Sequence, residues 1–176
     1  MRPENSRYKG SLMRFAAVLH EGHGSCDALM QAVVEQLKAS QLPIRGLQTW
    51  RGKDPNGRLP MLIQDIHTGD IYPISQPLGS GSQSCSLNPG ALANASAVLR
   101  AALADKPDLV IVNRFGNMEA KGQGFAAEML AIMAEDIPVL TVTSHQYQQQ
   151  WLAFTGEQGG LLPQSIDTIL QWAKTL

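Results

Sequence analysis

The chain alternates short apolar runs with longer stretches in which apolar residues recur every three or four positions. Runs that predict strands lie at residues 15–19, 44–50, 108–113 and 137–143. Stretches that predict helices lie at residues 28–40, 88–105, 124–136, 145–154 and 165–175. Strands that alternate with helices predict an α/β fold, in which helices flank a largely parallel sheet.

The middle of the chain follows a different pattern. Two further apolar runs flank a turn at residues 67–70 and predict a β-hairpin insertion near residues 58–75. The serine- and glycine-rich stretch 79–86 has the composition of a flexible loop. Asn88 followed by Pro89 predicts the start of a helix, because Asn caps helices and Pro is favoured at the first helical position.

Length and composition narrow the class of protein. We expect a single domain over residues 14–176, preceded by a flexible polar tail over residues 1–13. The net charge is −1, so no basic field favours nucleic acid or an anionic membrane surface. No apolar run approaches the roughly 20 residues that a membrane helix requires. The two cysteines form no disulfide framework. These features predict a cytoplasmic protein without nucleic-acid or membrane partners.

The predicted loops indicate where a ligand would bind. In α/β folds with parallel strands, the ligand crevice lies beyond the carboxyl ends of the strands. Three segments reach that edge of the predicted sheet: residues 20–27, residues 113–123 and the stretch just after Thr143. We therefore expect the functional site where these three segments meet.

The first of these loops resembles a phosphate-binding loop in its position. Gly22, Gly24 and Ser25 precede a helix whose first amides are suited to an anion. A Walker loop also requires a lysine for the outer phosphates, and no Lys or Arg occurs between Arg14 and Lys38. An anion site and an ordinary tight strand-to-helix turn both remain open here.

Cysteine and histidine side chains are the candidates for reactive or metal-binding groups in this sequence. His20, His23 and Cys26 lie in the first loop and are suitable donors for a transition metal. The sequence has no second paired cluster, so we predict no metal centre and interpret them as polar side chains at a turn. Cys85 precedes the helix that begins at Asn88, where a helix dipole lowers a thiol pKa, but an inert, partly buried thiol is the preferred interpretation.

The segment NRFGNMEAKGQGF, residues 113–125, carries a resemblance to a known family. It is similar to the hallmark N-R-F-G-(K/N)-x-E-x-x-G-x-G-(F/L) of an uncharacterised bacterial family of unknown function. CSLNPGAL (85–92), IPVL (137–140) and WLAFTG (151–156) also match that family. The resemblance therefore covers roughly residues 14–172.

Members of that family in turn resemble the small THEP-type P-loop nucleoside triphosphatases. The resemblance implies a three-layer, P-loop-NTPase-like α/β fold with degenerate Walker A and Walker B motifs. Some members of the family also lie in molybdenum-related gene neighbourhoods, which implies a link to molybdate metabolism.

Two positions depart from the nucleotidase pattern in a way that changes the chemistry. Where the nucleotidases have Asp and Glu, this chain has Asn113 and Arg114. A neutral Asn binds magnesium poorly compared with Asp, and Arg cannot act as a base at neutral pH. With the Walker lysine also missing, ordinary magnesium-dependent hydrolysis of nucleoside triphosphates is not expected.

Arg114 is instead well suited to a phosphate or another tetrahedral oxyanion such as sulfate or molybdate. The alternative is an Arg114 that forms an ion pair with Glu119 or Asp27 and so fixes the loops. Gly116 supplies backbone freedom beside it, although turn formation explains a glycine too.

Two classes of function follow from these residues. The favoured hypothesis is a non-hydrolysing accessory protein that binds a small anion, either a nucleotide or an oxyanion such as phosphate or molybdate. Its predicted ligand-binding residues are Gly22, Gly24, Ser25, Asn113, Arg114 and Gly116.

The alternative is an enzyme of altered mechanism, a nucleotide phosphohydrolase or phosphotransferase, that uses Arg114 with Glu119 or His145. For Glu119 itself, an ion pair or a cap on the helix at 124–136 is the preferred interpretation. A scaffold that acts through a protein partner or a homo-oligomer is a third option.

Overall fold

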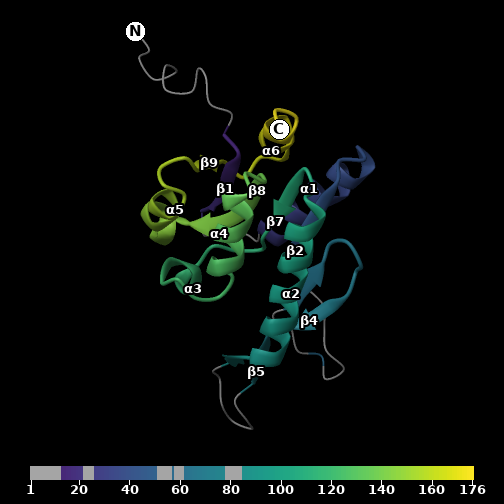
Figure 1. The fold of residues 1–176 in the computed structure, drawn as a ribbon, viewed down its shortest axis with the longest axis vertical. Helices are drawn as coiled ribbons and strands as arrows, with labels where there is room; N and C mark the ends of the chain where they lie inside the picture. The colour runs from purple at the N-terminus through teal and green to yellow at the C-terminus, as the bar shows by residue number, and fades with distance from the viewer. Residues whose placement is uncertain (1–12, 22–25, 51–56, 58–61, 78–84) are drawn as a thin grey trace.

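The computed structural model describes residues 13–21, 26–50, 57, 62–77 and 85–176 (Figure 1). Within these residues, a seven-stranded sheet has the order β4-β3-β2-β7-β8-β1-β9. Its strands are β1 (Phe15–His20), β2 (Ile44–Trp50), β3 (Leu62–Asp65), β4 (Ile71–Pro73), β7 (Leu109–Ile111), β8 (Val139–Ser144) and β9 (Gly160–Leu162). Strands β2, β7, β8, β1 and β9 are parallel, β3 pairs antiparallel with β2, and β4 pairs antiparallel with β3.

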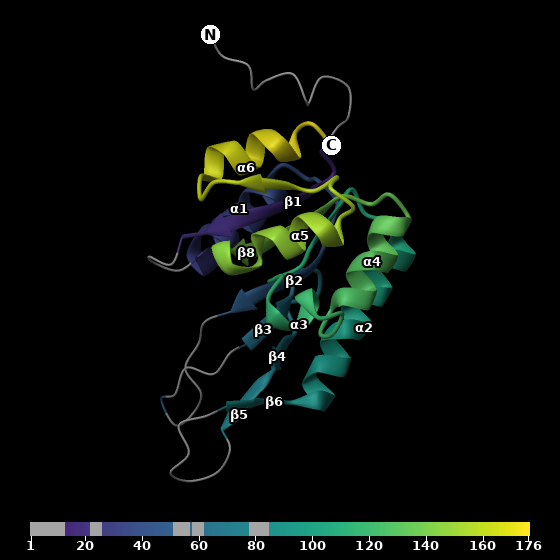
Figure 2. The same cartoon turned by 90° about the vertical axis from the view of Figure 1, so that its left-hand side faces the viewer.

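Helices cover both faces of this sheet. They are α1 (Cys26–Ala39), α2 (Pro89–Asp105), the single turn α3 (Asn117–Ala120), α4 (Ala126–Ala134), α5 (Gln148–Phe154) and α6 (Ile166–Ala173), with the 3₁₀ turn η1 (His145–Tyr147) before α5. Buried residues of α2, α4 and α5 form one core cluster, and those of α1 and α6 form a second. Figure 2 shows α2 and α4 side by side, away from α6. The three-layer α/β architecture is as predicted.

Strand β7 shows why a continuous apolar run forms in the middle of such a fold. Leu109 and Ile111 pack into the cluster under α1 and α6, whereas Val110 and Val112 pack into the cluster under α2 and α4. Side chains alternate between the two faces of a strand, so a strand covered on both faces needs apolar residues at every position. The apolar run therefore ends at Asn113, where the strand is no longer covered by helices on both faces.

The predicted start of α2 is confirmed. The side-chain oxygen of Asn88 accepts a hydrogen bond from the Ala91 amide at 3.1 Å, and Pro89 is the first helical residue. The Asn88 amide also donates to the Ile74 carbonyl at 2.8 Å. The cap therefore ties the start of α2 to the segment that follows β4.

Several short elements differ from the sequence-based expectation. The predicted hairpin is present, but its strands β3 and β4 extend the main sheet beside β2. The predicted loop at 79–86 ends in a strand, because β6 (Cys85–Leu87) pairs with β5 (Ser75–Pro77) in a small second sheet. Strand β9 and the single turn α3 were not predicted, because three- and four-residue elements carry too little periodicity to detect.

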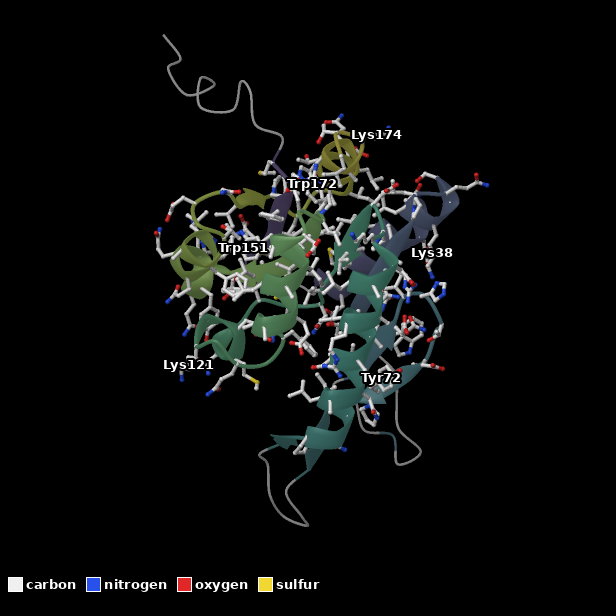
Figure 3. The ribbon with its side chains drawn as sticks, viewed as in Figure 1. Lys38, Tyr72, Lys121, Trp151, Trp172 and Lys174 are labelled. Carbon is white, nitrogen blue, oxygen red and sulfur yellow. The ribbon has the colours of Figure 1, made fainter. Side chains whose placement is uncertain are left out.

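Residues 1–12 of the predicted tail lie outside the described residues. Met13, assigned to the tail from the sequence, has its carbonyl oxygen 2.7 Å from Nε1 of Trp172, which donates to it. Figure 3 shows Trp172 near Lys174 at the end of the chain. In the part of the chain that the structure describes, no helix has the length and apolar character needed to cross a membrane.

Candidate functional site

A cavity of about 310 Å³ lies at the carboxyl ends of three parallel strands. His20 at the end of β1, residues 114–117 after β7, residues 142–144 at the end of β8, and residues 146–147 in η1 line it. His20 and Ser144 are register partners across β1 and β8. The edge where three loops were expected to meet is therefore the edge that carries the cavity.

An irregularity after β7 places the candidate residues at this edge. The Val112 amide donates to Leu140 O at 2.9 Å, and the Phe115 amide donates to Val142 O at 2.8 Å. The chain after β7 thus advances three residues while its partner β8 advances two. One extra residue between regular hydrogen bonds re-aims side chains, as a β-bulge does. Asn113 and Arg114 lie in this irregular step.

Arg114 is exposed at the cavity. With the residues that the structure describes it makes no hydrogen bond and no ion pair, so it pairs with neither Glu119 nor Asp27. The five N–H donors of its guanidinium are available for a planar or tetrahedral anion. Among the described residues, no ion pair supports the alternative in which Arg114 fixes the loops through Glu119 or Asp27.

Asn113 is the second unpaired group of this step. Its side-chain oxygen is buried and has no hydrogen-bond partner among the described residues. A buried polar atom without a partner costs about 1–3 kcal/mol. Asn113 does not itself line the cavity, so its predicted part in ligand binding stays a prediction.

Glu119 has a defined structural part in this loop. Its Oε2 accepts from the Gly116 amide at 3.1 Å, and its Oε1 accepts from the Phe125 amide at 3.2 Å, immediately before α4. The side chain is buried, with 8% of the residue exposed. These contacts are those of the helix-capping alternative. The Gly116 amide donates to Glu119, so this N–H does not point at the cavity, although Gly116 is one of the lining residues.

Two residues of the cavity lining, Thr143 and Phe115, contact each other and the buried core. Thr143 Oγ1 donates to the Phe115 carbonyl at 2.9 Å, in the buried interior. The Phe115 ring packs edge-on against Trp151, with ring centroids 5.4 Å apart, and lies 5.0 Å from the ring of Phe154. Trp151, on α5 (Figure 3), is fully buried, and its Nε1 donates to Gly160 O at 3.1 Å. The aromatic residues thus serve the core.

The charges at the cavity favour an anion. Its described lining contains Arg114, His20, hydroxyl groups and side-chain amides, and none of these described residues is an aspartate or a glutamate. A cation site would need carboxylate or carbonyl oxygens directed into the space. A guanidinium beside neutral donors is the arrangement that binds phosphate-like groups.

The first loop is only partly described. Gly22, His23, Gly24 and Ser25 lie outside the described residues, so their predicted roles stay predictions. No group of three or more potential metal ligands occurs in the described part of the chain, and His20 and Cys26 are not joined by a third donor there.

A residue that the sequence did not indicate holds the two ends of this loop. Gln164, between β9 and α6, accepts from the Glu21 amide at 3.2 Å and donates to Cys26 Sγ at 2.9 Å. Burial raises the pKa of the Cys26 thiol above its usual range, although the Gln164 hydrogen bond and the Arg114 charge lower it in part. No sequence signal distinguishes Gln164, because its contacts span well over 100 positions.

Two further residues considered from the sequence, His145 and Cys85, are not among the described residues that line the cavity. His145 is exposed at the start of η1, between two residues that line the cavity, but does not line it itself. Cys85 lies in β6, in the small second sheet. Their predicted roles gain no support from these positions.

Comparison with known proteins now places the chain. A family described as "Protein of unknown function (DUF2478)" matches residues 15–172. The chain belongs to this family. In this chain, the carboxylate of Glu119 accepts from the amides of Gly116 and Phe125, and a Cβ atom on Gly124 would lie 2.4 Å from its Oε1.

One relative of this DUF2478 chain is "Molybdenum import ATP-binding protein ModC 2" of Bradyrhizobium diazoefficiens, which is 34% identical over 160 residues. The match covers 90% of this chain and 18% of the relative, so the chain spans less than a fifth of that protein's length. A solved structure, THEP1 from the hyperthermophile Aquifex aeolicus, matches with a TM-score of 0.60 and 16% identity. It covers 92% of this chain and 95% of THEP1, and confirms the expected THEP-type fold.

Proposed function

We propose that this protein is a non-hydrolysing accessory protein that binds a small anion, a nucleotide or a tetrahedral oxyanion such as phosphate or molybdate. The binding site is the cavity at the ends of β1, β7 and β8. The observation that carries the proposal is the Arg114 guanidinium, which lies at this cavity without any ion pair to a described residue.

The residues that follow β7 support a function without ordinary hydrolytic chemistry. Asn113 is neutral where a nucleotidase carries a magnesium-binding aspartate, and Arg114 cannot take a proton from water. Both oxygens of Glu119 accept hydrogen bonds from backbone amides. No described group at the cavity is therefore placed both to hold magnesium and to activate water.

The size of the cavity limits the ligand. Small-molecule sites usually enclose about 300–1,000 Å³, so a cavity of about 310 Å³ is at the lower end of that range. It suits a free oxyanion, or the phosphate end of a nucleotide whose base lies outside. Arg114 would bind either one through paired N–H donors.

The relatives support a place for this protein in molybdate metabolism. The printed name of the Bradyrhizobium relative includes both molybdenum import and ATP binding, and a segment similar to this chain forms part of that longer protein. We propose that the present chain works in the cytoplasm beside such a transport system, through a protein partner or as a homo-oligomer. Molybdenum import in that name corresponds to the oxyanion class of ligand, and ATP binding corresponds to the nucleotide class.

A panel of ligands tests the proposal. Thermal unfolding would be followed with ATP, GTP, phosphate, sulfate, molybdate and tungstate, each with and without magnesium. A ligand at 100 times its dissociation constant stabilises the folded state by about 2.7 kcal/mol. We expect a shift that needs no magnesium, and no shift with any of these ligands would contradict the proposal.

Two variants assign the effect to the cavity. Arg114→Ala removes charge-assisted hydrogen bonds worth about 1.5–3 kcal/mol, which corresponds to roughly 10- to 100-fold weaker binding. Lys121→Ala removes a positive charge from the same segment, and Lys121 is exposed outside the cavity lining. Figure 3 shows Lys121 on the outer side of α3. Equal losses in both variants would indicate general charge attraction instead of the proposed site.

A further inference from the structure

We infer that Glu119 is a positioning residue, whose carboxylate holds the loop after β7 so that the Arg114 guanidinium stays at the cavity. The inference rests on the proposed function, because Arg114 is the group proposed to bind the anion. It goes beyond that function in giving the buried carboxylate of this chain a defined part in binding, in place of a catalytic one.

The first step is the pair of backbone contacts that Glu119 makes. Its two oxygens accept from the amides of Gly116 and Phe125 at 3.1 and 3.2 Å. Gly116 ends the loop that carries Arg114, and Phe125 immediately precedes α4 as its N-cap. Since α4 is anchored in the core by Met129 and other buried residues, the carboxylate ties a surface loop to a fixed element.

The second step is the path of the Arg114 side chain. A Cβ atom placed on Gly116 would lie 3.4 Å from Cδ of Arg114 and 3.9 Å from Oε2 of Glu119. The aliphatic part of Arg114 therefore passes close to Gly116, and Glu119 holds the same glycine by its amide. A change in the position of Gly116 moves the surface against which Arg114 lies.

The third step is an independent tether on the preceding residue. Phe115 is held through both of its backbone polar groups, since its amide donates to Val142 O and its carbonyl accepts from Thr143 Oγ1. Glu119 and Thr143 thus fix two consecutive residues after Arg114. Binding groups held in place before the ligand arrives lose less entropy when it binds.

The geometry also separates this role from that of a general base. A base must have an oxygen lone pair directed at the proton that it removes. The Glu119 oxygens face two backbone amides, and Glu119 does not line the cavity. A positioning role predicts that loss of the carboxylate weakens binding, whereas a base role predicts that binding persists and turnover is lost.

The test uses Glu119→Gln, which keeps the shape of the side chain but replaces one accepting oxygen with an NH₂ group. Its matched control is Glu128→Gln. Glu128 is a largely buried carboxylate on α4 that pairs with Arg100 at 3.4 Å, away from the cavity. Calorimetry with phosphate, molybdate and ATP, without magnesium, gives the dissociation constant of each variant. Any turnover of ATP is measured in parallel with magnesium present.

We expect about tenfold weaker binding for Glu119→Gln, because displacement of a binding group by a fraction of an ångström is enough for such a loss. Glu128→Gln should bind as the wild type does. Amide hydrogen exchange at Gly116 and Phe125 should become faster in Glu119→Gln, which shows that the two tethers have been released.

Each result has a distinct meaning. If the wild type binds none of the three probes, the proposed function fails and the inference fails with it. If Arg114→Ala weakens binding but Glu119→Gln does not, the inference alone is overturned, and loss of turnover in that variant would assign Glu119 as a base. If Glu119→Gln does not fold, Gly124→Ala displaces the carboxylate from outside the cavity lining, since a Cβ atom there would lie 2.4 Å from Oε1 of Glu119, and unchanged affinity in that variant contradicts the inference.

Discussion

Replacing Gly124 with alanine tests the two hydrogen bonds through which the Glu119 carboxylate joins the Gly116 and Phe125 amides beside the candidate site. Gly124 has φ of +60°, a left-handed conformation that is unfavourable for residues with a side chain. A Cβ atom there would lie 2.4 Å from Oε1 of Glu119 and 3.1 Å from Cβ of Met118. The new methyl group must therefore displace the carboxylate that accepts from the Gly116 and Phe125 amides.

Gly122, in the same turn, provides the matched control. It has φ of +77°, but a Cβ atom placed on it meets no other atom within 4 Å. The conformational cost of Gly122→Ala is about 1–2 kcal/mol. Gly124→Ala carries the same cost and in addition weakens two hydrogen bonds to a charged group, each worth about 1.5–3 kcal/mol. We therefore expect Gly124→Ala to be more destabilising by about 2–4 kcal/mol.

Urea unfolding of the two variants and the wild type gives this difference directly. The same pair of substitutions made in a Glu119→Ala background completes the measurement, because additivity fails only for groups that interact. With the carboxylate gone, most of the extra cost of Gly124→Ala over Gly122→Ala should disappear, and only the part due to the close contact with Cβ of Met118 should remain. Equal destabilisation by the two glycine variants in the wild-type background would show that the Glu119 hydrogen bonds do not contribute to stability as described.

Two further predictions concern the unpaired and buried groups of the site. Asn113→Leu should stabilise the ligand-free protein by about 1 kcal/mol, because it removes a buried acceptor that lacks a partner, and it should reduce the stabilisation that an anion confers; a destabilised ligand-free variant would contradict this. Burial raises the pKa of the Cys26 thiol above its ordinary value of 9.0, and the hydrogen bond from Gln164 offsets this only in part. In a Cys85→Ala background, Cys26 should therefore react slowly with a thiol reagent at neutral pH, and its contribution to stability should be complete below pH 9.0 and be lost as pH rises through the higher folded-state pKa. Unfolding measured across that range against Cys26→Ala checks the sign.

The order of helices and strands could be predicted because a strand that is buried on both faces has apolar residues at every position. Strand β7 is apolar at every position, and the Asn88 cap is a local signal whose hydrogen bond lies within four residues. The position of the cavity followed from the same pattern, since parallel strands bring their carboxyl ends to one edge. Arg114 was identified because it is a cation just after such a strand.

The remaining features depend on contacts between distant parts of the chain. Thr143 tethers Phe115 across 28 positions, and Gln164 reaches Cys26 across 138. The backbone irregularity after Val112 is set by its pairing with β8, which no single segment reveals. The orientation of Glu119 decides between a cap and a base, and side-chain orientation cannot be derived from spacing alone.

The central claim is that the Arg114 guanidinium binds an anion at the carboxyl ends of β1, β7 and β8. Calorimetric titration of wild type, Arg114→Ala and Lys121→Ala with ATP, phosphate and molybdate, in the absence of magnesium, tests it most directly. The account predicts saturable binding of at least one of these anions, roughly 10- to 100-fold weaker for Arg114→Ala and unchanged for Lys121→Ala. Binding of equal strength in wild type and Arg114→Ala would contradict it.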